Sequence, residues 1–137
     1  MGGAVVFVSG QAYRRQDLHT QYGGQRQGGI STPARYPFIL LFTSETGTRH
    51  GYDDHWTADG RFLYTGEGQF GNMELVRGNK AIRDHQDNGK QLLLFENLGG
   101  GTVRYVGEFK SEGYQETVAS DTEGRLRKAI VFRLARV

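Results

Sequence analysis

The sequence contains no cysteine in its 137 residues, and it has only two prolines and one tryptophan. The absence of cysteine excludes disulfide bonds and thiolate metal sites. A reducing compartment fits this composition, and we therefore expect a cytoplasmic protein. The two prolines stand beside 21 glycines, so the chain is rich in turns without a collagen-like or low-complexity pattern.

Long apolar runs are also missing, since no segment approaches the roughly 20 apolar residues needed to cross a membrane. The first ten residues, MGGAVVFVSG, have an apolar patch without a basic flank, which is unlike a signal peptide. The formal net charge of +2 permits a polyanionic partner without requiring one. We expect no membrane association and a single domain over residues 1–137.

Apolar periodicity predicts mostly β-structure. The expected strands are 36–44, 61–65, 91–96, 102–109, 113–120 and 128–137. Helices are expected at 14–22 and 79–89, the second with Asn79 as its N-cap. Short connections between the late strands favour antiparallel pairing. The predicted fold class is therefore α+β: a curved, mostly antiparallel sheet closing into a barrel, with two or three flanking helices.

One glycine-rich run raises a nucleotide-binding alternative. Residues 66–71, GEGQFG, match the pattern G-x-G-x-x-G and follow a predicted strand. That fingerprint needs a helix that opens within the glycine run, so that its N–H groups face the pyrophosphate. Here Gly78 and Asn79 interrupt any helix begun at Phe70. A nucleotide-dependent enzyme stays as an alternative that this pattern supports only weakly.

A second enzymatic alternative is a metal-dependent nuclease. His50 and His55 lack the H-x-H or H-x-x-x-H spacing of a metal site. Asp53, Asp54 and Asp59 could bind Mg²⁺, but the sequence identifies neither the further carboxylate nor the lysine that such a centre needs. No G-x-S-x-G motif is present. We expect no metal, no cofactor and no catalytic residue.

Three motifs occur in order along the chain: GYDDHW at 51–56, FLYTGEGQ at 62–69 and RGNKAI at 77–82. In this order they resemble the SRA (SET- and RING-associated, or YDG) domain, a family that recognises modified cytosine in DNA by flipping the base out. The upstream YGGQRQGGIS resembles the family's glycine-containing loop that enters the duplex. The similarity covers most of the chain and looks closest to SRA-like domains of prokaryotic modification-dependent restriction systems. It implies an SRA/PUA-like fold.

The resemblance also implies a pocket in which two aromatic rings sandwich the flipped base. Tyr52 and Tyr64 stand at the stacking positions, and Asp53 or Asp54 would accept a hydrogen bond from the cytosine amine. In eukaryotic members the base-reading aspartate falls three residues after the first tyrosine, where this chain has His55. Either Asp54 takes the role through a one-residue shift, or His55 alters the specificity. The implied pocket residues are Tyr52, Asp53, Asp54, His55, Tyr64, Thr65 and Gly66.

The same resemblance implies a loop that fills the gap left by the flipped base, with Arg26 and Gln27 as the inserted side chains. The loop residues are Arg26, Gln27, Gly28 and Gly29. The expected phosphate contacts are Arg14, Arg15, Arg77, Lys80 and Arg83. The implied partner is double-stranded DNA with 5-methylcytosine or 5-hydroxymethylcytosine, with an HNH nuclease as a separate partner or fused domain. An RNA-binding barrel is the third alternative.

Overall fold

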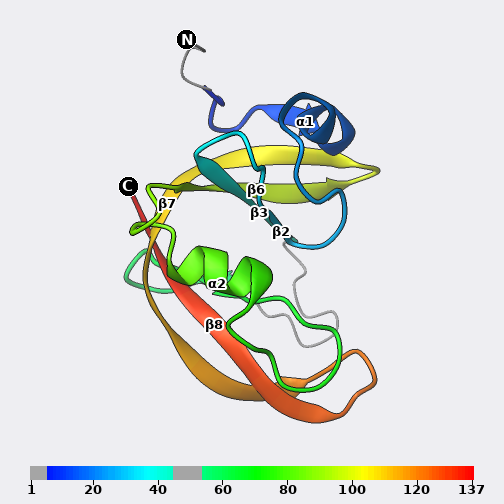
Figure 1. Ribbon diagram of the computed structural model, residues 1–137, viewed down its shortest axis with the longest axis vertical. Coiled ribbons are helices and arrows are strands. Elements are labelled where there is room, and N and C mark those ends of the chain that lie inside the picture. Colours follow the sequence, from blue (N-terminus) through cyan, green and yellow to red (C-terminus); the bar gives the residue numbers. More distant parts are fainter. Residues whose placement is uncertain (1–5, 45–53) are drawn as a thin grey trace.

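The structure is a computed structural model that describes residues 6–44 and 54–137. Within them lie eight strands and two helices (Figure 1). The elements are β1 (Ala12–Arg14), α1 (Arg15–Tyr22), β2 (Ile30–Ser31), β3 (Phe38–Ser44), β4 (His55–Trp56), β5 (Phe62–Thr65), α2 (Arg77–Arg83), β6 (Gln91–Gly99), β7 (Thr102–Ser120) and β8 (Leu126–Arg136). One sheet runs in the order β2-β3-β6-β7-β8-β5-β4, and β1 pairs with β7.

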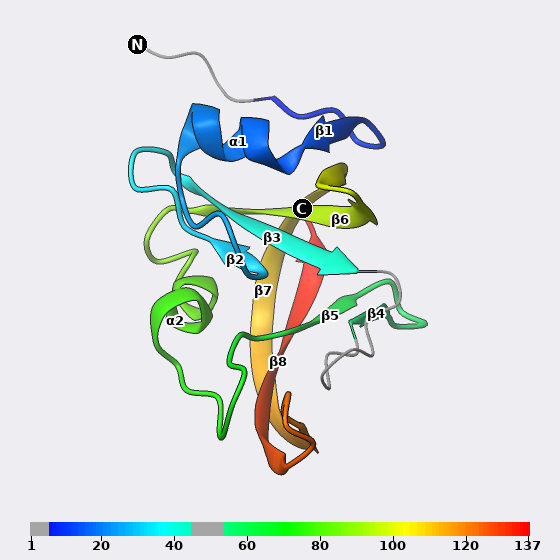
Figure 2. The ribbon, with the colours of Figure 1, turned by 90° about the vertical axis from the view of Figure 1, so that its right-hand side faces the viewer.

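The long strand β7 joins two segments that the sequence predicts as separate strands. Its first half pairs with β6 and its second half with β8. Between Ser111 and Tyr114 the register with β8 shifts, and Gly113 lies there with φ +120°. A bulge of this kind bends a strand and increases its twist. Beyond the bend, the second half of β7 runs with β8 away from β3 and β6, as Figure 2 shows.

The prediction that the sheet closes into a barrel is wrong. Among the described residues, no backbone ladder joins the two ends of the sheet, β2 and β4, and each of these strands has only two residues. Strands this short cannot carry the staggered pairing that closes a barrel. The pairing is also mixed, because β3 and β6 run parallel.

Side chains cross the seam between β3 and β5 in place of a ladder. The Tyr64 hydroxyl on β5 lies 3.1 Å from the Phe42 carbonyl oxygen on β3. Asp54 accepts hydrogen bonds from the Thr43 hydroxyl on β3 and from the Thr65 N–H on β5, both at 2.7 Å. The two halves of the sheet are thus joined by polar side chains at this seam.

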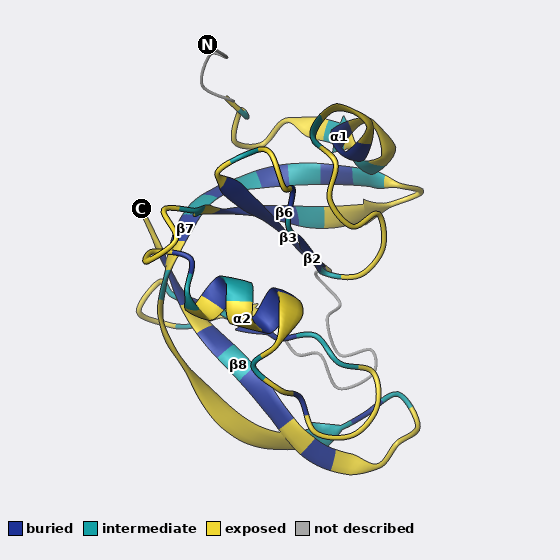
Figure 3. Ribbon diagram, in the orientation of Figure 1, coloured by how far each residue is buried: buried dark blue, intermediate teal, exposed yellow. Residues whose placement is uncertain are grey.

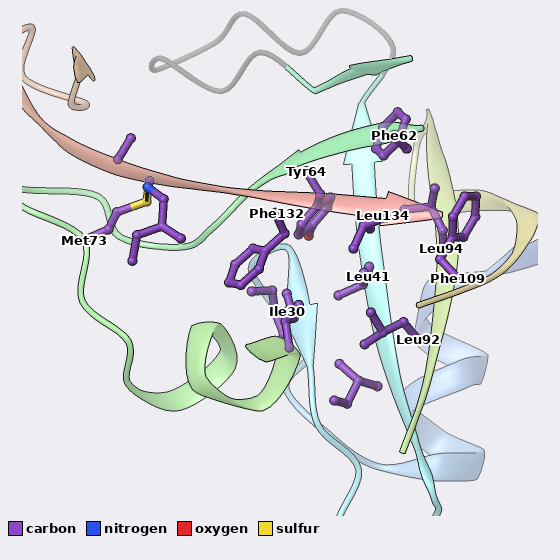
Figure 4. Close-up of a cluster of buried hydrophobic side chains, with 14 residues drawn as sticks. Ile30, Leu41, Phe62, Tyr64, Met73, Leu92, Leu94, Phe109, Phe132 and Leu134 are labelled. Atoms are coloured by element: carbon purple, nitrogen blue, oxygen red, sulfur yellow. Dashed lines mark hydrogen bonds between the residues drawn. The ribbon is translucent and has the colours of Figure 1, made fainter. Parts of the chain in front are cut away.

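The apolar core lies on both faces of β3, as its continuous apolar run predicts. One cluster contains Ile39 and Leu41 with residues of β5, β6 and β8 (Figure 4). The other contains Phe38, Leu40 and Phe42 and is covered by Leu18 of α1. Figure 3 shows that buried and half-buried positions alternate along the first half of β7, that most of its second half is exposed, and that buried positions recur along β8.

The described residues form two helices, as expected, but the bounds of α2 differ from the prediction. It begins at Arg77 and ends at Arg83, whereas 84–89 form turns. Asn79 does not cap it, because Asn79 lies inside the helix with its side chain buried. α1 ends at Tyr22 before Gly23, as expected. In the part of the chain that the structure describes, no helix is long and apolar enough to span a membrane.

Candidate nucleic-acid interface

A cavity of about 1090 Å³ opens along the seam between β3 and β5. Its walls come from the segment 25–32, from the ends of β3 and β5, and from the segment 66–79. These segments carry two of the three recognised motifs and the glycine-containing loop. Thus the open seam of the sheet and the motif residues coincide.

Tyr64 forms a fixed wall of this cavity. Its side chain is only 2% exposed, and its hydroxyl donates to the Gly29 carbonyl oxygen at 2.6 Å. Burial raises the pKa of Tyr64 well above its usual value, so the phenol stays protonated. A Cβ built on Gly29 would lie 2.8 Å from the Tyr64 hydroxyl oxygen. Glycine at position 29 therefore lets the loop approach the tyrosine.

Asp54 lines the cavity, and the two hydrogen bonds from Thr43 and Thr65 orient its carboxylate. Thr65 and Gly66 line it too. His55 does not line it; His55 is exposed on β4, pairs with Leu63 and borders a separate cavity of about 260 Å³. The other two predicted pocket residues, Tyr52 and Asp53, lie outside the described residues.

A clamp between Glu67 and Asn79 holds two of the motifs together. The Asn79 amide oxygen accepts from the Glu67 N–H at 2.8 Å, and its nitrogen donates to the carbonyl oxygens of Glu67 and Glu74, each at 2.9 Å. The Glu67 carboxylate accepts from the Gly78 N–H at the start of α2, at 2.9 Å. A Cβ on Gly66 would lie 2.6 Å from the Asn79 amide oxygen. The pairing explains why glycine and asparagine stand in these motifs.

The clamp also bears on the nucleotide-binding alternative. α2 begins at Arg77, well after Gly71, so no helix opens within the glycine run. The Gly78 N–H near its start is already bonded to Glu67. Dinucleotide-binding loops need free N–H groups at a helix that starts in the run. Sequence reasoning missed Glu67 and the buried role of Asn79, because neither residue type signals a contact between segments twelve residues apart.

Arg15 and His19 support the base of the 23–29 loop. The Arg15 guanidinium lies 3.9 Å from the centre of the Phe42 ring, and its Nε donates to His19 Nε2 at 2.9 Å. His19 Nδ1 lies 2.9 Å from the Gly23 carbonyl oxygen. Since Nε2 accepts, the ring is neutral and Nδ1–H donates. Burial lowers the pKa of His19 and of Arg15.

The other basic residues predicted to contact DNA are exposed. Arg77 lines the cavity and has φ +48°, a left-handed conformation that is uncommon for a residue other than glycine. Lys80 lies on the same helix, and Arg83 there is hydrogen-bonded to Asp84 at 2.8 and 3.1 Å. Arg14 lies on β1. The structure thus places two candidate cations near the cavity and leaves Arg14 beside α1.

In the predicted insertion loop, Gln27, Gly28 and Gly29 line the cavity, whereas Arg26 is exposed outside its lining. Within the described ranges, no group of three or more histidines or carboxylates is arranged to hold a metal ion. The cavity therefore combines aromatic side chains and oriented polar groups with one lining cation, Arg77, and the carboxylates of Asp54, Glu67 and Glu74.

The sequence model of the ScoMcrA-like SRA domain matches residues 9–137. This chain belongs to the ScoMcrA-like SRA domain family. The family indicated by the three motifs is thereby confirmed. Among curated proteins no match was found.

Solved structures show the same SRA fold. The sulfur-binding and SRA domains of ScoMcrA, complexed with phosphorothioated DNA, align with a TM-score of 0.78 and 22% identity over 97% of this chain and 40% of that chain. The structure of the type IV phosphorothioation-dependent restriction endonuclease ScoMcrA aligns with the same TM-score and identity. This alignment covers 97% of this chain and 28% of the ScoMcrA chain. The SUVH5 SRA domain in complex with hemi-methylated CG DNA aligns with a TM-score of 0.70 and 21% sequence identity. The alignment covers 100% of this chain and 94% of the SUVH5 chain. This SRA domain thus spans less than half of the ScoMcrA chains.

Proposed function

We propose that this SRA domain is a reader of modified cytosine in double-stranded DNA and flips the modified base into the cavity at the β3–β5 seam. The observation that carries the proposal is that this one cavity is lined by Asp54, Tyr64 and the glycine-containing loop. A flipped base needs a pocket with aromatic surface and polar groups for its Watson–Crick edge. The ScoMcrA and SUVH5 structures, which hold phosphorothioated and methylated DNA, support DNA as the partner.

The base-pocket roles follow from the lining. Tyr52 supplies a stacking ring, and Tyr64, whose ring packs in the core and is 2% exposed, forms the wall that its bond to Gly29 holds in place. Asp54, with Asp53 beside it in sequence, accepts from the cytosine amine. The position of Asp54 in the cavity, with His55 outside it, favours Asp54 as the reader. Thr65 and Gly66 present polar and backbone groups to the base.

The duplex contacts are proposed from the rim. Gln27 lines the cavity and Arg26 does not, which favours Gln27 as the side chain that fills the gap left by the base. Arg77 and Lys80 contact phosphates, because both are exposed and α2 borders the cavity. The remaining candidates, Arg14, Arg15 and Arg83, are weaker, since Arg15 supports the loop and Arg83 bonds Asp84.

We further propose that the domain has no catalysis of its own and serves as the reader module of a restriction-type system. Any nuclease activity then belongs to an HNH domain, fused or separate. The family match to ScoMcrA-like SRA domains supports this role.

The test is binding to one duplex in four forms at fixed salt: unmodified, with 5-methylcytosine, with 5-hydroxymethylcytosine, and with a phosphorothioate linkage. Fluorescence anisotropy on the wild type should give tighter binding to a cytosine-modified form than to the unmodified one. Tyr52→Ala should remove that preference, because one stacking ring contributes about 1–3 kcal/mol. Leu98→Ala, an exposed apolar residue outside the cavity, serves as the control.

Equal binding to all four duplexes overturns the proposal. A preference for the phosphorothioate alone moves recognition from the base to the backbone. Tighter binding to RNA of the same sequence than to any duplex supports the RNA-binding alternative. Tyr64→Ala is a poor probe here, because loss of a buried aromatic ring costs about 3–5 kcal/mol of folding stability.

A further inference from the structure

Phe70 is an aromatic residue whose ring faces water at the edge of the cavity. It is 62% exposed, whereas every other phenylalanine in the described residues is buried or half-buried. Phe70 lines the cavity, and Val76, also exposed, lines it nearby in sequence. A single exposed apolar side chain needs no explanation by itself. The segment that carries Phe70, however, is held in place by hydrogen bonds to a distant turn and to β8.

Residues 68–72, here called the Phe70 loop, are bonded to the turn between β7 and β8. The N–H and the hydroxyl of Thr122 both donate to the Gln69 carbonyl oxygen, at 3.0 and 2.9 Å. The Asp121 carboxylate accepts from the Gly71 N–H at 3.3 Å. The backbone on both sides of Phe70 is thus tied to a turn some fifty residues away in sequence.

Arg127 on β8 adds a buried cation beneath the same loop. It is 4% exposed, and its Nη1 donates to the carbonyl oxygens of Gly68 and Gly71 at 3.0 and 2.9 Å. A charge is costly to bury unless it is hydrogen-bonded. Here Nη1 joins the two ends of the Phe70 loop, whereas the buried Nε and Nη2 have no hydrogen-bond partner among the described residues. The exposed ring is therefore carried on a preorganised support.

We infer that Phe70 is a wedge that inserts into the duplex beside the flipped nucleotide. The inference rests on the proposed function. Phe70 and Gln27 line the same cavity from two different segments, so the duplex is engaged from both. Apolar side chains inserted at a base step unstack it and help to open the pair. A braced loop keeps the ordering cost of such an insertion low.

The test measures affinity for two duplexes that each carry one 5-methylcytosine, opposite guanine in one and mispaired with adenine in the other. The mispaired base is already easier to extrude. Phe70→Ala should weaken binding to the paired duplex about tenfold and to the mispaired duplex less than about threefold, given the size of base–aromatic stacking. Phe70→Leu should retain most of the affinity, because leucine also acts as a wedge.

Leu98→Ala is the matched control, since it removes an exposed apolar side chain outside the cavity. Thermal unfolding of each variant verifies that it is folded. Equal losses on both duplexes make Phe70 an ordinary contact and overturn the wedge, as does no loss on either. The wild type is also measured on the unmodified paired duplex, and equal binding to it and to the methylated paired duplex overturns the proposed function itself, and the wedge with it. That result is read from the wild type before any variant is compared.

Discussion

At Tyr64 a single side chain belongs both to the core and to the candidate site. Its ring packs in the cluster with Phe132 and Leu134, and its hydroxyl bonds the loop that borders the cavity. Asn79 has a similar double position, inside α2 and across from Glu67. At the scale of the residue, the polar atoms that join the motifs are therefore buried. Their loss should affect folding as well as binding.

Asn79→Ala should lower the free energy of unfolding by about 2–4 kcal/mol, because it removes three hydrogen bonds and leaves half-buried backbone groups of Glu67 without their partner. Urea denaturation measures the change. Asn88→Ala is the control, since Asn88 is exposed in the turns after α2. Equal stabilities of the two variants would show that the clamp is not a folding contact.

Because of His19, the free energy of unfolding should depend on pH at values below the ordinary pKa of histidine, which is about 6.5. Burial lowers its pKa in the folded state, so the unfolded chain binds the proton more readily. Its contribution is therefore present above the unfolded pKa of about 6.5 and is lost as the pH falls toward the lower folded value. Protonation would also place an N–H on Nε2, facing the Arg15 donor.

Unfolding free energies from pH 8 to pH 5 test this dependence. His19→Gln should flatten the profile near pH 6, whereas Gln86→Ala, at an exposed position in the turns after α2, should leave it unchanged. An unaltered profile in His19→Gln would assign the titration to another group.

At the scale of the element, α2 begins under strain. Arg77, its first residue, has φ +48°, and side chains cost energy in this left-handed region. Unfavourable backbone geometry is often found at functional sites. Here it places a cation at the first turn of α2, on the border of the cavity.

Arg77→Gly should leave the free energy of unfolding within about 1 kcal/mol of wild type, because relief of the left-handed strain offsets the added freedom of the unfolded chain. The same variant should bind DNA more weakly and reduce the salt slope by about one. Arg35→Gly is the control, since Arg35 is exposed, lacks a positive φ and lies outside the cavity. Undiminished DNA binding by Arg77→Gly would remove Arg77 from the phosphate contacts.

Local sequence patterns suffice to predict the longer strands individually. The apolar run of β3 predicts a strand buried on both faces, and the structure has one. The patterns at 102–109 and 113–120 also predict strands correctly, but not their union in β7. That union depends on Gly113 and on pairing with both β6 and β8, which are contacts between distant segments.

At the scale of the whole molecule, the small net charge limits the number of phosphate contacts. The chain carries a formal charge of only +2, yet α2 presents exposed Arg77 and Lys80 beside the cavity. Binding to DNA should therefore depend on salt through few phosphate contacts. A plot of log K against log salt concentration should have a slope of roughly −2 to −5, at about 0.9 per phosphate. A slope near zero would contradict binding through the DNA backbone.

The sequence by itself determined the longer strand-forming segments and the family, and it predicted some of the residues that line the cavity, among them Asp54 and Tyr64. Periodicity reports burial locally, and the three motifs are specific because they occur in order. The tertiary structure decided that the sheet stays open, that Asn79 binds Glu67, and that Arg127 supports the loop of Phe70. Each of these depends on atoms from segments far apart in the chain, such as Tyr64 and Gly29. Their approach is set by the packing of the whole sheet, which no local pattern encodes.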